Sequence, residues 1–229
     1  GSVRAWPKPL SVAVDPGTRW EKHEKSPDEL GLVRAPEQLQ LGVVVILSRD
    51  PDLDGPPRLE RIGLVEAINT GLPQTSSMLM LHPPLTQLAH LLTLGQGPWR
   101  LTYREIGECL DLVTEVAGAS RTRRPSPVPW TSTQEEAEPD DAEHVGGGAS
   151  ERAAGITAQT VVARSPHADA VTSEGESLVL RQGLTTILPG LASLLWEALG
   201  SPLEVAALAD VATAALGEHP SARDVVLET

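Results

Sequence analysis

The strongest constraint on the fold comes from two short strand-like runs near the C-terminus that are separated by two residues. The runs are Glu176–Arg181 and Leu184–Leu188, and the pair Gln182-Gly183 lies between them. Two such runs joined by a pair that ends in glycine are typical of a β-hairpin with a two-residue turn. Helical sequence follows the second run at once, so we expect a hairpin followed by helices in one small domain.

Three helical segments are predicted after the hairpin. Gly200-Ser201-Pro202 ends the first, and Ser201 is expected to cap the second with Pro202 in its first turn. Gly217 ends the second, and Ser221 opens a third that is cut short at Thr229, so we expect the chain to be part of a longer protein. The apolar faces are formed by Leu191, Leu194, Leu195 and Leu199 in the first helix and by Val205, Leu208, Ala209, Ala212 and Leu216 in the second.

The same stretch carries a family resemblance. A hairpin followed by three helices, with Leu-Leu-Trp-Glu-Ala-Leu at 194–199 and Gly-Ser-Pro-Leu at 200–203, resembles the PqqD family of peptide-recognition domains. Such domains have no active site and hold the leader segment of a precursor peptide for a modifying enzyme. The resemblance therefore implies two partners, a precursor (leader) peptide and a modifying enzyme. Trp196 is expected to anchor the core where the first helix crosses the hairpin, and the alternative is direct contact with the peptide.

The resemblance also implies where a peptide binds. In a PqqD-like domain the exposed edge of the small sheet accepts the leader as an added strand. The edge here is Leu184–Leu188, and replacement of Thr186 by Pro is expected to remove an edge amide. The third helix forms the facing wall, where Arg223 is expected to meet an acidic leader residue, while Val226 and Leu227 receive an apolar one or complete the core. The candidate peptide-binding residues are Leu184, Thr185, Thr186, Ile187, Leu188, Arg223, Val226 and Leu227.

The first half of the chain alternates strand-like and helical sequence. Leu41–Leu47 is a continuous apolar run, which is typical of a strand buried on both faces of a sheet. In the closing helix, Ile106, Leu110 and Val113 are expected to point inward. Strands are predicted at 3–14, 41–47, 59–65 and 99–103, a short helix at 65–69, and longer helices at 79–94 and 104–116.

This half has its own, independent resemblance. Val-Arg-Ala-Trp-Pro-Lys-Pro-Leu-Ser at 3–11, the stretch 67–79 and Trp99–Val113 look like the last third of bacterial HPr-kinase-like proteins, a P-loop kinase class. The chain contains no G-x-x-x-x-G-K-[ST] segment to cradle phosphates, so the catalytic residues of that family have no counterpart here. We expect no kinase activity, no catalytic residue and no cofactor. Lys8 is the one basic residue in a family-like motif, with a role near phosphate or as an ordinary exposed lysine.

Composition divides the chain and excludes some partners. Residues 118–155 are rich in Pro, Gly, Ser and charge, so we expect a disordered linker between an α/β part at 3–117 and a recognition domain at 156–229. A net charge of −13 argues against nucleic acid and anionic membranes, and no apolar run reaches the length of a membrane span. The lone Cys109 excludes an internal disulfide and fits the cytoplasm. The histidines lack the spacing of metal ligands.

Together these observations predict an α/β remnant joined to an α+β domain, a small hairpin sheet with three winged-helix-like helices. The expected function is non-catalytic binding of a leader peptide during maturation of a ribosomally synthesised, post-translationally modified peptide. Two alternatives are a fragment of an ATP-dependent HPr-kinase-like phosphotransferase and a regulatory scaffold that binds another protein through its α/β part.

Overall fold

A computed structural model describes residues 2–4, 10–13, 22–33, 38–75, 80–120, 128–135 and 156–217. These residues form a mixed α/β structure with five α-helices and several small sheets. The contacts divide the chain into one unit at Gly1–Gly42 and a second at Val43–Thr229. None of the helices in the described ranges is long and apolar enough to cross a membrane.

The first unit contains two small antiparallel sheets. β1 (Ser2–Arg4) pairs with β4 (Gln38–Gln40), and β2 (Leu10–Ala13) pairs with β3 (Lys22–Lys25). A 3-10 turn, η1 (Asp28–Leu30), follows β3. β2 and all of β1 except Ser2 fall in the stretch 3–14 that the sequence predicts as strand.

The second unit begins with a three-stranded sheet. β5 (Val44–Arg49) runs parallel to β7 (Pro98–Tyr103), and β6 (Arg58–Arg61) lies antiparallel on the other side of β7. The expectation that the apolar run at 41–47 is buried on both faces is wrong, because β5 is an edge strand and Leu47 is 60% exposed. The side chains of a strand are buried only where another layer packs on the face of the sheet, so an apolar sequence does not by itself secure burial.

The helix that closes the first half faces the opposite way from the prediction. A 3-10 turn, η4 (Ile106–Cys109), leads into α3 (Leu110–Ser120). Ile106, Leu110 and Val113, expected to point inward, are exposed, Leu110 at 68%. The buried Cys109 points inward instead, and Leu112, Val116 and Ala119 line a pocket with Trp99 of β7. Both sets follow helical spacing, so periodicity alone does not choose between them.

The second sheet of this unit contains the predicted hairpin. β11 (Glu176–Arg181) and β12 (Leu184–Pro189) are antiparallel, and Gln182 and Gly183 both have positive φ, at 51° and 78°. Positive φ at both central residues is the conformation of a type I′ hairpin turn. Two further strands complete the order β12-β11-β10-β8, namely β10 (His167–Ser173) and β8 (Thr131–Glu135).

β8 lies within the stretch expected to be a disordered linker. Ser132 and Thr133 pair with Val171 and Ala170 of β10, so for 131–135 the expectation is wrong. The strand is polar and short, so few of its side chains can be buried. Backbone hydrogen bonds to β10 stabilise it instead. α3 also extends to Ser120, and Val128 and Trp130 pack against the core described below. Linker residues 121–127 and 136–155 lie outside the described residues.

Two helices from the first half of the chain pack on one face of this second sheet. α1 (Leu64–Gly71) and α2 (Pro84–Thr93) contribute to one apolar cluster with β10 and β11. The cluster contains Leu64, Val65, Ile68, Leu85, Leu88, Leu92, Val171, Leu178 and Leu180. Residues on both sides of the expected linker therefore share one hydrophobic core, and the boundary between contact units lies at Gly42 and Val43 instead.

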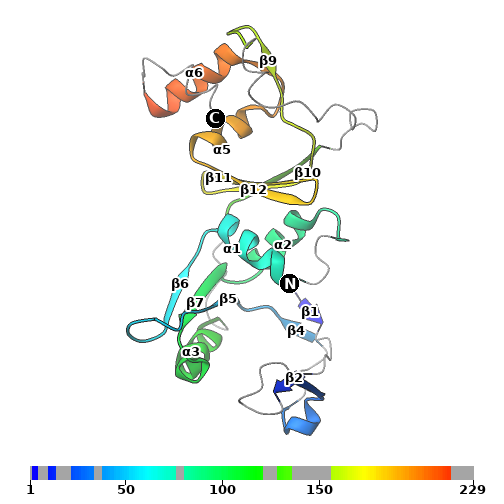
Figure 1. Ribbon diagram of the computed structural model, residues 1–229, viewed down its shortest axis with the longest axis vertical. Coiled ribbons are helices and arrows are strands. Elements are labelled where there is room, and N and C mark those ends of the chain that lie inside the picture. The colour runs from blue at the N-terminus through cyan, green and yellow to red at the C-terminus, as the bar shows by residue number, and fades with distance from the viewer. Residues whose placement is uncertain are drawn as a thin grey trace. The chain divides into compact units, whose positions relative to one another are not determined.

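The other face of the sheet is covered by α5 (Leu191–Ala198). Figure 1 shows α5 and the α1–α2 pair on opposite sides of the β10–β12 strands. Ser177 of β11 and Ser193 of α5 are both buried, and their hydroxyls lie 2.7 Å apart in a hydrogen bond. A short pair of strands, β9 (Val161–Val162) and β13 (Leu203–Glu204), and α6 (Val205–Leu216) pack around Leu195 in a second small core.

The helical predictions are confirmed in part. Both helices after the hairpin are present, and Gly217, with φ 86°, lies at the end of α6. Ser201 does not cap α6, which begins at Val205 with Glu204 at the N-cap position. The reason is that Leu203 and Glu204 pair with β9, which delays the helix by a turn. The predicted third helix, with Arg223, Val226 and Leu227, lies outside the described residues.

Candidate functional site

β12 is the outer strand of the four-stranded sheet, and most of its side chains are exposed. Within the described ranges, no strand pairs with its outer side (Figure 1). Leu184 is 73% exposed and Ile187 is 40% exposed. An outer strand of six residues presents backbone N–H and C=O groups on which another strand can pair. All five β12 candidates from the sequence, Leu184, Thr185, Thr186, Ile187 and Leu188, therefore lie on one open edge.

The register of the hairpin decides which backbone groups point outward. In a two-residue turn the C=O of Arg181 accepts a hydrogen bond from the N–H of Leu184, so these two residues form a hydrogen-bonded pair. Hydrogen-bonded and non-hydrogen-bonded pairs alternate along an antiparallel ladder. Leu184, Thr186 and Leu188 thus direct their backbone groups toward β11. Thr185, Ile187 and Pro189 direct theirs outward, and Pro189 has no N–H to offer.

This register corrects the expectation for Thr186. Thr186 lies opposite Val179 in a hydrogen-bonded pair, so its amide belongs to the hairpin and not to the open edge. A proline at Thr186 would break the hairpin ladder instead of blocking a ligand. The outward amides are those of Thr185 and Ile187. The two-residue turn already implied this alternation in the sequence, because loop length sets hairpin register.

The side chains of β12 alternate between two different environments. Thr185 and Ile187 lie opposite Leu180 and Leu178, so they share the face that packs on α1 and α2. Thr186 and Leu188 lie on the face covered by α5. An added strand would therefore place alternate side chains toward α1 and toward α5.

One side-chain contact ties this edge to the first half of the chain. The Thr185 hydroxyl donates a hydrogen bond to Oδ1 of Asn69 in α1, at 3.3 Å between the two oxygens. Both side chains are half-buried, so they lie at the rim of the edge. The sequence carried no signal for Asn69, because the two residues are 116 positions apart.

Trp196 packs against residues at and before the start of β10. Its ring contacts the ring of His167 edge-to-face, with centroids 4.9 Å apart, and the guanidinium of Arg164 lies 4.9 Å from its centroid. Nε of Arg164 also donates to the Trp196 carbonyl at 2.7 Å. These contacts join α5 to the start of β10, so Trp196 helps to hold the helix on the sheet.

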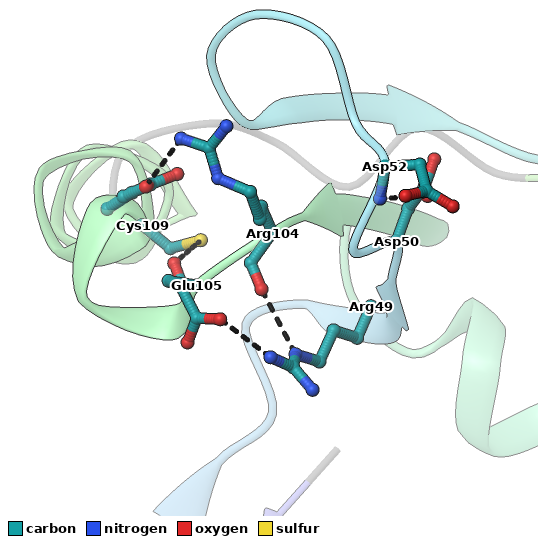
Figure 2. Close-up of polar contacts among 7 residues, drawn as sticks. Arg49, Asp50, Asp52, Arg104, Glu105 and Cys109 are labelled. Atoms are coloured by element: carbon teal, nitrogen blue, oxygen red, sulfur yellow. Dashed lines mark hydrogen bonds and ion pairs between the residues drawn. The ribbon is translucent and has the colours of Figure 1, made fainter.

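A second polar cluster lies where the parallel strands β5 and β7 end (Figure 2). Nη2 of Arg49 donates to Oε1 of Glu105 at 2.6 Å, and its Nε donates to the Arg104 carbonyl at 3.1 Å. Arg104 in turn pairs with Glu108 at 3.1 Å. The carboxyl ends of parallel strands are a frequent ligand-binding place in α/β sheets. Here each guanidinium has a carboxylate partner, which reduces the net positive charge that the cluster presents.

The remaining groups of this cluster do not form a reactive centre. Burial raises the pKa of the Cys109 thiol, and the nearby carboxylate of Glu108 raises it further, so the thiolate is disfavoured. The backbone N–H of Asp52 donates to Oδ1 of Asp50 at 3.0 Å, which closes the loop on itself. In the described part of the chain, no three His, Cys, Asp or Glu side chains gather as metal ligands would. Lys8 lies outside the described residues.

Comparison of the chain with models of protein families, with curated proteins and with solved structures finds no match.

Proposed function

We propose that this protein binds the extended leader segment of a precursor peptide at the outer edge of β12 and catalyses no reaction itself. The single observation that carries the proposal is the outward direction of the backbone groups of Thr185 and Ile187 on an exposed edge strand. A peptide that pairs there gains main-chain hydrogen bonds for affinity and alternating side-chain contacts for selectivity.

The two faces of β12 fit an extended peptide better than a helix or a small molecule. Leu184 projects an exposed apolar side chain, and Ile187 does so on the opposite face of the strand. A strand added at this edge would cover both. Pro189 ends the run of outward amides, so the edge accepts a short segment and does not invite endless strand addition.

The setting follows from the resemblance to the PqqD family. A bound leader would be presented to a separate modifying enzyme in the cytoplasm. The HPr-kinase-like alternative has less support, because the chain lacks a phosphate-binding loop and both Arg49 and Arg104 are paired with carboxylates.

The experiment compares Ile187→Pro with Ile187→Val. Because the ligand is unidentified, the probe is a display library of random nine-residue peptides selected on the wild-type protein, and enriched peptides are titrated by fluorescence anisotropy. Ile187→Pro removes one outward amide and leaves a ligand carbonyl without a donor, which costs about 2 kcal/mol, or roughly a 30-fold loss of affinity. Ile187→Val keeps the amide and is expected to bind within about twofold of wild type, as a change of one methyl at a half-exposed site contributes little.

Circular dichroism and thermal melting of the two variants verify that the hairpin is retained. If Ile187→Pro, folded, binds the enriched peptides as tightly as the wild type does, the β12 edge is not the binding site. If no peptide is enriched on the wild-type protein, the proposal of peptide binding fails.

A further inference from the structure

In the described part of the chain, Asn69 of α1 contacts the β12 edge through a hydrogen bond. α1 packs against β10 and β11 through buried leucine, valine and isoleucine side chains, which sets its position beside the sheet. Near the end of α1, Asn69 Oδ1 accepts the Thr185 hydroxyl at 3.3 Å. Thr185 is one of the two residues whose amides point outward, so this contact lies where a ligand strand would begin to pair.

An added strand would bring one of its side chains against Asn69. Residues directly opposite each other in paired strands have Cβ atoms about 5 Å apart on the same face of the sheet. The ligand residue opposite Thr185 would therefore lie on the α1 side. The Asn69 amide carries two N–H donors on Nδ2 in addition to the oxygen that Thr185 already occupies. A ligand side chain with a hydrogen-bond acceptor can satisfy them.

The next residue of β12 on the same face, Ile187, is apolar instead of polar. Ile187 lies two residues along β12 from Thr185, opposite the fully buried Leu178. Its 40% exposure leaves apolar surface that a ligand side chain would cover. Because successive residues of a strand alternate between faces, the two ligand positions on this face lie two positions apart, with one residue between them.

We propose that Asn69 is a specificity-determining residue, which selects an acceptor-bearing side chain two residues away from an aliphatic one in the bound peptide. This inference rests on the proposed function. It assigns to α1 a part in reading the peptide, so the β12 edge is completed by the half of the chain that precedes it.

The test is a change of specificity. The same nine-residue library is selected on wild type, Asn69→Asp, Asn69→Ala and the control Gln87→Glu. Asn69→Asp replaces the two donors by an acceptor-only carboxylate, so Lys or Arg is expected to replace the acceptor-bearing residue, while the aliphatic preference two positions away is unchanged. Asn69→Ala is expected to lose selectivity at that one position.

Gln87→Glu introduces the same change of amide to carboxylate on an exposed residue of α2, which packs against β10 and so lies away from β12. It is expected to enrich the wild-type pattern, and a shift with this variant would attribute the effect to net charge and overturn the inference. Identical enriched peptides on wild type, Asn69→Asp and Asn69→Ala would also overturn it while leaving peptide binding intact. Absence of any enriched peptide on wild type would remove the proposed function, and the inference with it.

Discussion

Replacement of Asp169 by Ala tests whether β10 holds helix α2 in place. Asp169 is fully buried, and its Oδ2 accepts the backbone N–H of Thr86 at 2.8 Å while its Oδ1 accepts the Thr86 hydroxyl at 2.7 Å. Thr86 lies in the first turn of α2, whose N-cap residue, Pro83, has no side chain that can accept a hydrogen bond. A carboxylate 83 residues further along the chain thus caps the helix.

The magnitude follows from these two bonds. A hydrogen bond to a charged group contributes about 1.5–3 kcal/mol, and loss of a helix cap alone costs about 1 kcal/mol. Ala removes both acceptors, leaves the Thr86 amide without its partner and opens a small cavity, whereas it also removes the desolvation cost of a buried carboxylate. We expect a net loss of about 3 kcal/mol in the free energy of unfolding. Asn keeps one acceptor for the Thr86 amide, so its cost is about 1 kcal/mol.

The assay is urea unfolding followed by far-ultraviolet circular dichroism, with amide hydrogen exchange at Thr86 and the rest of the first turn of α2. Asp210→Ala, on an exposed face of α6, serves as the matched control and is expected to change stability by less than about 0.5 kcal/mol. If Asp169→Ala unfolds at the same urea concentration as Asp210→Ala, or if exchange at Thr86 is unchanged, the carboxylate does not cap α2.

Two further predictions follow from pKa shifts. Because burial raises the pKa of Cys109, its thiol in the folded protein is expected to react with a disulfide reagent at mildly alkaline pH far more slowly than in urea, and equal rates would contradict its burial. Hydrogen bonds from the backbone and hydroxyl of Ser26, which forms a capping box with Glu29, lower the pKa of the Glu29 carboxyl. Their stabilisation of η1 is therefore present above the ordinary pKa of the carboxyl and is lost as the pH falls through the lowered value. Ser26→Ala removes the hydroxyl and keeps the backbone N–H, so it is expected to raise the pKa of Glu29 only part of the way to its ordinary value in an NMR titration, and an unchanged titration would exclude the hydroxyl as a cause.

The local elements near the C-terminus could be read from the sequence because neighbouring residues determine them. The Gln182-Gly183 pair adopts the two positive φ angles that a tight hairpin needs. Gly217, which also has a positive φ, lies at the end of α6. The apolar periodicity of 191–199 and 205–216 likewise places both helices. The open edge at β12 followed from the resemblance, and the two-residue turn carried the information needed to assign its outward amides.

Contacts between distant residues were decided by the tertiary structure alone. A polar segment such as Thr131–Glu135 has no strand pattern of its own and becomes β8 because β10 offers unpaired backbone groups. The facing of α3, the Asp169 cap on α2 and the bond between Thr185 and Asn69 likewise depend on partners that local sequence does not specify. Periodicity determines which residues share a face. Which face is buried, and against what, depends on the apolar and polar surfaces that other elements bring to it.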